Sequence, residues 1–188
     1  EQRSNVAENY PEVVERLRSH HELWWSEVSG NLAEYARIPI GNAEENPVKL
    51  DAFDVMGDAG VHQVDLIKAK KSLGKWAVTV EQQGNYRFSL SRWPAEIDIP
   101  IQGCISDEEA AGLAPYGGVV TTCTRMQPKQ AVLKLFGIER RVEISATDPS
   151  IVFEVEVDTI GDTEIEASFV NADGSSQGAY YLYAELVE

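Results

Sequence analysis

The chain has 188 residues, of which 43% are hydrophobic and 25% are charged, a composition typical of one globular domain with or without a short appendage. Asp and Glu number 31 against 16 Lys and Arg, giving a formal net charge of −15. This negative excess argues against binding to nucleic acid or to an anionic membrane, because phosphate groups would be repelled. No apolar run approaches the roughly 18 residues that a transmembrane helix needs. We therefore expect neither nucleic acid nor membrane as a partner.

An amphipathic helix is predicted for residues 11–29. Apolar and aromatic side chains recur there every three or four positions, as on one face of a helix: Val13, Val14, Leu17, His21, Trp24, Trp25 and Val28. Asn9 and Glu12 have the spacing of a capping box, and Gly30 suits a left-handed C-terminal stop. The two adjacent tryptophans are too large to remain in water, so we expect this face to pack against another surface.

After residue 31 the pattern changes to the two-residue period of β-strands. In residues 151–157, for example, Ile151 and Phe153 would point to one face and Glu154 to the other. Similar segments occupy residues 48–53, 76–80, 86–90, 131–136, 142–144, 165–169 and 179–183. Short strands at intervals of roughly ten residues, with no helices between them, predict a mainly β fold. We expect an antiparallel, jelly-roll-like β-sandwich preceded by one helix.

Residues 101–124 lack this alternation, and we interpret them as a loop across one end of the sandwich, with a helical turn near residues 107–113. The two cysteines, Cys104 and Cys123, lie in this stretch. No further cysteines and no nearby histidine cluster would complete a zinc site, and the histidines that could activate a thiol lie far upstream. Two alternatives stay open: a disulfide in an oxidising compartment, or two buried free thiols.

The remaining candidate sites are acidic or aromatic. Most carboxylates fall on the solvent side of strands or in turns, which favours a solvated acidic face over paired catalytic carboxylates. Alternatively, the acidic clusters at Asp54 and Asp58 and at residues 107–109 would hold a structural calcium ion, without EF-hand spacing. Trp93, beside Arg92 at a strand end, is interpreted as a plug for the end of the sandwich, with stacking on a sugar or sulfate as the alternative. No residue is assigned a catalytic, cofactor-binding or metal-binding role.

Several sequence fragments occur in a defined order. The first two are residues 3–7, Arg-Ser-Asn-Val-Ala, and residues 10–17, Tyr-Pro-Glu-Val-Val-Glu-Arg-Leu. The others are Gly-Lys-Trp at 74–76, Val-x-Val at 78–80, Gly-x-Tyr-Arg-Phe-x-Leu at 84–90, Arg-Trp-Pro-Ala-Glu at 92–96, Asp-Gly at 173–174 and Gly-Ala-Tyr-Tyr-Leu-Tyr at 178–183. In this order they resemble the end of the catalytic unit of arylsulfatase-type sulfatases, followed by the C-terminal extension of a group of bacterial sulfatases.

The resemblance implies that residues 1–32 are the terminal helical segment of a sulfatase-like catalytic unit, and that residues 33–188 are an appended C-terminal β-sandwich domain. It also implies a periplasmic or secreted protein. Family catalysis uses a formylglycine, made from the Cys or Ser of a Cys/Ser-x-Pro-x-Arg signature, and a divalent cation, usually calcium. Cys104 is followed by Ile-Ser-Asp-Glu and Cys123 by Thr-Arg-Met-Gln, so neither has this signature. No catalytic residue or cofactor is carried over, and we interpret the chain as the end of a longer protein.

The residue patterns and the resemblance together lead to two main candidate functions, and a purely structural or adhesive domain is kept as a third class. The first is a non-catalytic C-terminal domain of a sulfatase, a sulfuric ester hydrolase, which supports or shapes the missing N-terminal catalytic domain. The alternative is a carbohydrate-binding β-sandwich that recognises sulfated or other glycans, against which the shortage of basic residues counts. The partner of the helix would be the catalytic domain or a second copy of the chain. The chain alone is not expected to be an enzyme.

Overall fold

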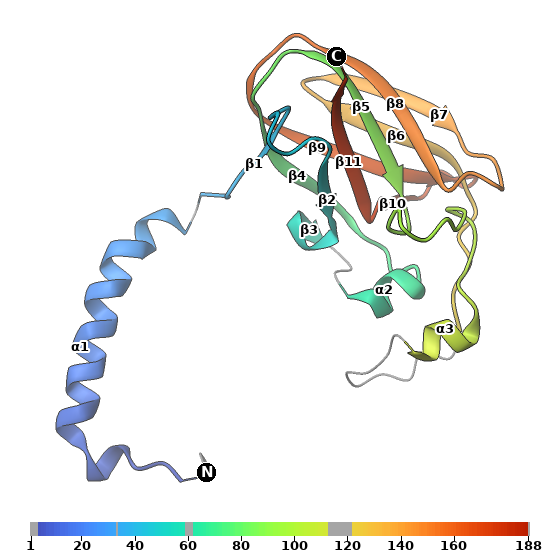
Figure 1. Ribbon diagram of the computed structural model, residues 1–188. Coiled ribbons are helices and arrows are strands. Elements are labelled where there is room, and N and C mark those ends of the chain that lie inside the picture. The colour runs from blue at the N-terminus through green and yellow to red at the C-terminus, as the bar shows by residue number, and fades with distance from the viewer. Residues whose placement is uncertain (1–3, 33, 59–61, 113–121, 188) are drawn as a thin grey trace. The chain divides into compact units, whose positions relative to one another are not determined.

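The computed structural model describes residues 4–32, 34–58, 62–112 and 122–187 (Figure 1). The chain divides into two compact units, Glu1–Ala36 and Arg37–Glu188. The first unit contains a long helix, and the second contains two β-sheets with a hydrophobic core between them. The predicted fold class, mainly β with one N-terminal amphipathic helix and a β-sandwich, is confirmed.

Helix α1 extends from Pro11 to Val28, one residue less than predicted. The predicted capping box is wrong, because Asn9 belongs to a preceding 3-10 turn, η1 (Ala7–Asn9). Tyr10 takes the N-cap position instead, and its side chain makes no capping hydrogen bond. Pro11 explains this difference, because the residue before a proline is kept out of the helical conformation. Tyr10 accordingly has φ −137° and ψ 57°.

The end of the helix also differs from the prediction. Gly30 does not adopt the expected left-handed conformation but lies in a second 3-10 turn, η2 (Ser29–Asn31). The backbone N–H of Ser29 donates to the carbonyl oxygen of Trp25, and that of Leu32 donates to Ser29. The helix therefore ends by tightening into 3-10 geometry, one of the ways in which its last carbonyl groups find partners.

Two sheets form the sandwich within the described residues. The larger has the order β1-β4-β9-β6-β7, with β3 beside β4 and β10 beside β9. Its strands are β1 (Ile38–Ile40), β3 (Val55–Asp58), β4 (Leu73–Val80), β6 (Pro128–Leu135), β7 (Ile138–Glu143), β9 (Gly161–Asn171) and β10 (Ser176–Gly178). The smaller has the order β2-β11-β5-β8 and consists of β2 (Val48–Asp51), β5 (Gly84–Ser91), β8 (Ser150–Val157) and β11 (Tyr181–Val187).

Each of the predicted strand segments corresponds to a strand, but β1, β3 and β10 were not predicted. Each has only three or four residues, too few to establish a two-residue period. The expectation of purely antiparallel pairing is also wrong at one edge, where β1 pairs parallel with β4. The intervening chain is long enough for the crossover that a parallel pair requires. The other pairs between described strands are antiparallel.

The core lies between the two sheets because each strand buries alternate residues. In β8 the buried residues are Ile151, Phe153, Val155 and Val157, and Phe153 lies opposite Phe88 of β5 in the ladder. Trp76 of β4 is 1% exposed, and its indole N–H donates to the carbonyl oxygen of Asp51 at the end of β2 (2.8 Å). This hydrogen bond joins a central strand of the larger sheet to the edge of the smaller one.

One end of the sandwich is covered by loops with two short helices, α2 (Gln63–Ile67) and α3 (Asp107–Gly112) (Figure 1). Helix α3 coincides with the helical turn predicted near residues 107–113, whereas α2 was not predicted. Residues 113–121 of the predicted loop lie outside the described residues. Beneath these loops, Ile67, Trp93 and Ile105 form a second, smaller hydrophobic cluster. Trp93 is 2% exposed, which confirms the plug interpretation.

The two phenylalanines at positions 88 and 53 provide a matched test of the core. We expect Phe88→Ala to lower the free energy of unfolding by about 3–5 kcal/mol, because a fully buried aromatic side chain leaves a cavity. Phe53 is 71% exposed, so Phe53→Ala is expected to change this free energy by about 0.5 kcal/mol or less. Urea denaturation of both variants measures the difference, and equal losses would contradict the described core.

Candidate functional site

In each acidic cluster considered as a calcium site, one carboxylate makes hydrogen bonds within the chain. Asp54 accepts a hydrogen bond from the backbone N–H of Asp51 (3.1 Å), which closes a capping box on the 3-10 turn η3 (Ala52–Asp54). Glu109 accepts hydrogen bonds from the backbone N–H (2.9 Å) and the hydroxyl (2.7 Å) of Ser106, and these bonds lower the pKa of Glu109. Within the described residues, no group of three or more His, Cys, Asp or Glu side chains could hold a metal ion.

Cys104 and Cys123 form a disulfide, with their Cα atoms 5.7 Å apart. This decides between the two alternatives that the sequence leaves open. The bond ties the segment before α3 to the segment that leads into β6, 19 positions later. It also occupies both thiols, so neither cysteine is available as a nucleophile in the oxidised protein.

Arg92, at the end of β5, is fully buried and holds this end of the sandwich together. Its guanidinium group donates hydrogen bonds, 2.8–3.1 Å long, to four backbone carbonyl oxygens: Leu66, Ile67, Gly103 and Thr124. Burial lowers the pKa of Arg92 to about 10, so the group remains protonated at neutral pH. The arginine thereby joins α2 to the two segments that the disulfide also links.

The Arg92–Trp93 pair is internal and does not form the sugar-stacking surface that was the alternative in the sequence. The guanidinium carbon of Arg92 lies 4.5 Å from the centroid of the Trp93 ring, within the range of a cation–π contact. Both side chains are almost completely buried. Their role is to close the end of the sandwich.

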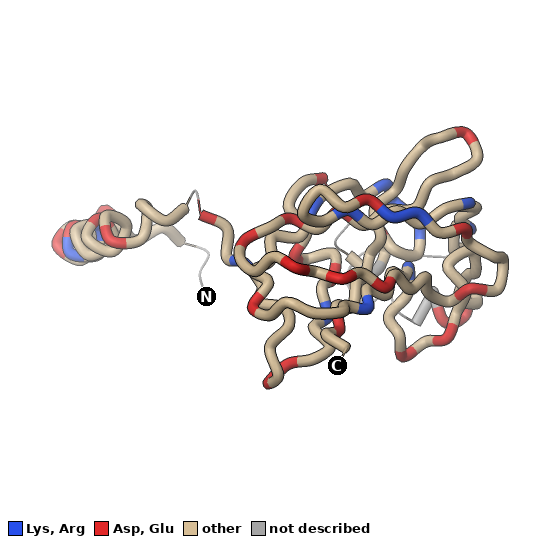
Figure 2. Tube along the Cα trace, turned by 90° about the horizontal axis from the view of Figure 1, so that it is seen from above, with Lys and Arg blue, Asp and Glu red and all other residues tan. Residues whose placement is uncertain are grey.

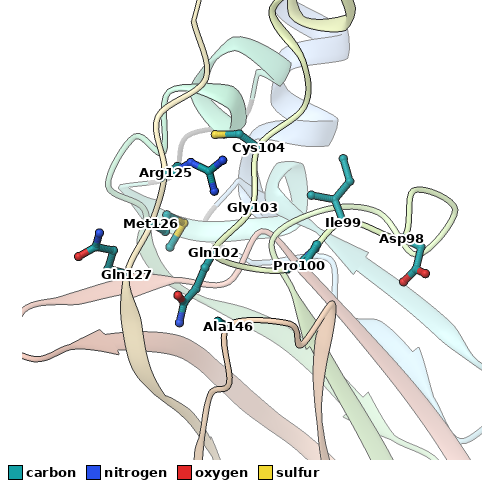
Figure 3. A pocket seen from close by; sticks show the side chains of 10 residues that line it. All are labelled: Asp98, Ile99, Pro100, Gln102, Gly103, Cys104, Arg125, Met126, Gln127 and Ala146. Atoms are coloured by element: carbon teal, nitrogen blue, oxygen red, sulfur yellow. The ribbon is translucent and has the colours of Figure 1, made fainter.

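A depression of about 460 Å³ lies beside the disulfide (Figure 3). Figure 3 shows the segment with Gly103 and Cys104 opposite the segment with Arg125 and Met126, and the Arg125 side chain points across the gap. The Gln102 amide is already engaged, because it donates to the carbonyl oxygen of Pro128 (3.1 Å). Among the described residues that line the depression, Asp98 and Arg125 are the charged ones.

A second pocket, of about 290 Å³, lies on the outer face of the four-stranded sheet. We call it the outer-face pocket. Its base carries Ser89 of β5, Ser150 of β8 and Tyr183 and Glu185 of β11, and the loop after β5 closes one side. None of these residues was predicted as a site residue from the sequence. The signal was nevertheless present, since each occupies an outward position of an alternating strand.

The outer face of the larger sheet carries a row of paired charges across β4, β9, β6 and β7, which we call the charge row. Its ion pairs are Lys75–Glu164 (2.7 Å), Lys75–Glu166 (3.7 Å), Lys134–Glu166 (3.4 Å), Lys134–Glu139 (3.8 Å) and Arg141–Glu139 (2.7 Å). The bond from Lys75 to Glu164 raises the pKa of Lys75. Figure 2 shows acidic residues along strands and loops of the sandwich, with basic residues between them. This pairing leaves the face without a strongly basic patch.

In the unit that contains it, helix α1 buries none of its residues. His21, Trp24 and Trp25 form an aromatic cluster on its surface, with ring centroids 5.7–6.2 Å apart. Trp24 is 50% exposed, Trp25 45% and Leu17 59%. These side chains form the aromatic face of α1, which is a candidate docking surface rather than a reactive site.

Comparisons with known proteins identify no family. No family model matches the chain, and no curated protein matches it. Among solved structures, a ruminal GH26 endo-β-1,4-mannanase is similar, with 13% sequence identity and a TM-score of 0.39. The match covers 77% of this chain but only 26% of the mannanase chain. Similarity at this level carries no inference about function. No helix among the described residues is long and apolar enough to cross a membrane.

Arg92 and Arg87 provide a matched pair for testing the buried guanidinium. We expect Arg92→Met to lower the free energy of unfolding by about 3 kcal/mol or more, because buried carbonyl groups lose their donors. Arg87 forms a partly exposed ion pair with Glu185 (3.0 Å), so Arg87→Met should cost about 1 kcal/mol or less. Guanidinium denaturation of both variants measures this difference. Equal stability of the two variants would show that Arg92 does not hold the loops.

Proposed function

We propose that the chain is the non-catalytic C-terminal domain of a bacterial sulfatase, with helix α1 packing against the catalytic domain and the sandwich supporting that domain. The observation that carries the proposal is the aromatic face of α1, which has no covering residues within its own unit. A face with two half-exposed tryptophans requires a partner surface. The sequence resemblance to the end of a sulfatase catalytic unit covers the same helix.

The sandwich fits a supporting role because it completes its own core. Its two sheets bury an extensive set of apolar side chains against each other. The hydrogen bonds of Arg92 and the disulfide hold the loops at one end together. The disulfide is also compatible with the proposed periplasmic or secreted location, since such bonds persist in oxidising compartments. The formylglycine and the divalent cation of the parent enzyme would belong to the catalytic domain.

The first test of this proposal is enzymatic. We expect the purified 188-residue chain to hydrolyse p-nitrophenyl sulfate at the background rate, and the longer polypeptide encoded by the same gene to hydrolyse it with turnover. The longer polypeptide should contain the Cys/Ser-x-Pro-x-Arg signature, which supplies the nucleophile. Turnover by the chain alone, lost in Cys104→Ser or Cys123→Ser, would overturn the proposal. A longer polypeptide without the signature would do the same.

The second test concerns the aromatic face of α1. Trp24→Ala should leave the thermal melt of the isolated chain nearly unchanged, because Trp24 is not part of a core in its own unit. In the longer polypeptide the same change should destabilise by about 3 kcal/mol, the cost of truncating a buried tryptophan. Glu22→Ala, on the opposite face of the helix, is the control. Sedimentation of the isolated chain tests self-association. A stable dimer lost in Trp24→Ala would assign the face to a second copy and contradict the proposal.

A second candidate function, recognition of a glycan, is favoured by one specific observation. The outer-face pocket combines hydroxyl groups, a tyrosine ring and carboxylates on a rigid sheet. Recognition of sulfated glycans would require a basic patch. In each of the two basic groupings of the sequence, one residue has an acidic partner: Lys70 lies 3.7 Å from Asp65, and Arg141 lies 2.7 Å from Glu139. The hydroxyl and carboxylate groups of the outer-face pocket favour a neutral glycan over a sulfated one.

A further inference from the structure

The outer-face pocket is rigid because hydrogen bonds hold its walls. The backbone N–H of Ala95 donates to the hydroxyl oxygen of Tyr183 (3.0 Å), which fixes the loop after β5 against β11. On the other side, the Asn46 side chain donates to the carbonyl oxygen of Leu186 and accepts from its N–H, both at 2.8 Å. Asn46 thereby holds the adjacent Pro47, which lines the pocket. A preformed pocket loses little conformational entropy on binding.

The lining has both an apolar and a hydrogen-bonding part. Pro47, Pro94, Pro149 and Ile97 supply apolar surface, and the almost completely buried Trp93 also borders the pocket. Ser89 and Ser150 are partly exposed, and within the described part of the chain their hydroxyl groups have no hydrogen-bond partner. A hydroxyl group both donates and accepts, so these two serines can pair with a ligand that also does both. A pyranose has this dual character, with an apolar C–H surface and a rim of hydroxyl groups.

The acidic residues of the pocket distinguish neutral pyranoses from sulfated ones. Among the described residues that line it, the charged ones are Asp98 and Glu185. Arg87 is directed to the carboxylate of Glu185 (3.0 Å) and is not part of the lining. Carboxylates accept hydrogen bonds from sugar hydroxyl groups. Because Arg87 compensates the charge of Glu185, Asp98 is the lining group that repels a sulfate ester at short range.

We infer that the outer-face pocket binds a neutral sugar unit, with its hydroxyl groups on Ser89, Ser150 and the pocket carboxylates and its C–H surface against the prolines and Tyr183. This inference rests on the second candidate function, glycan recognition, and not on the sulfatase proposal. It restricts the ligand to uncharged saccharides and excludes the sulfated ones.

The test is an NMR titration of the ¹⁵N-labelled 188-residue chain with six probes. Four are neutral: the methyl β-glycosides of glucose, galactose, mannose and xylose. Two are charged: the 6-sulfates of the methyl β-glucoside and of the methyl β-galactoside. At least one neutral glycoside should shift the amide signals of Ser89, Ser150 and Tyr183 with a dissociation constant in the millimolar range. If that probe is the glucoside or the galactoside, its 6-sulfate should bind about tenfold more weakly, because the Asp98 carboxylate repels the sulfate group.

Three variants locate the binding. Ser89→Ala combined with Ser150→Ala should weaken binding at least about fivefold, since two hydrogen bonds are lost. Ser89→Tyr should abolish it by filling the pocket. Ser168→Ala, on the outer face of the larger sheet, is the matched control and should have no effect.

The outcomes separate the proposals. Binding by no neutral glycoside, or undiminished binding in Ser89→Tyr, overturns both this inference and the glycan candidate. Equal or tighter binding of a 6-sulfate overturns the inference but leaves glycan recognition in place. Neither result bears on the aromatic face of α1, which the sulfatase proposal depends on.

Discussion

The buried guanidinium of Arg92 is the constraint on which one end of the sandwich depends. Its two terminal nitrogens, Nη1 and Nη2, make all four carbonyl hydrogen bonds only if α2 and the segments on both sides of the disulfide lie around them at the same time. A buried cation without partners destabilises the folded state by several kcal/mol. Any arrangement of the loops that removes their carbonyl groups from Arg92 is therefore unfavourable. The planar group with five donors suits this task, whereas a lysine could not reach as many carbonyls. The loop after β5 begins at Arg92, so the same constraint fixes a wall of the outer-face pocket.

The sheets and the loops could be predicted from the sequence to very different degrees. The strands of the core were visible because their alternation extends over several residues, as in Ile151, Phe153 and Val155. Helix α1 was predicted for the same reason, because its apolar residues recur every three or four positions over several turns. Strand β1 was not visible, because three residues are too few for a period and its parallel pairing depends on a distant strand.

The candidate sites were harder to predict than the fold. Trp93 was predicted as a plug for the end of the sandwich, but the burial of Arg92 beside it depends on carbonyl groups up to 32 positions away, which the sequence does not reveal. Ser89 and Tyr183 lie directly opposite each other in the β5–β11 ladder, although they are far apart in the sequence. A pocket assembled in this way leaves no local motif. From the sequence, only the position of each residue on the outward face of its strand could be predicted.

The charge row has a consequence for how the larger sheet finds its register. Lys134 of β6 lies opposite Glu166 of β9 on one side and Glu139 of β7 on the other. A slip of β7 by two residues preserves which side chains face the core, so hydrophobicity alone does not prevent it. In one direction such a slip would place Arg141 opposite Lys134. Like charges in that position repel, at a cost of about 0.2–1 kcal/mol. The surface charges thus disfavour a misaligned strand that the core would tolerate.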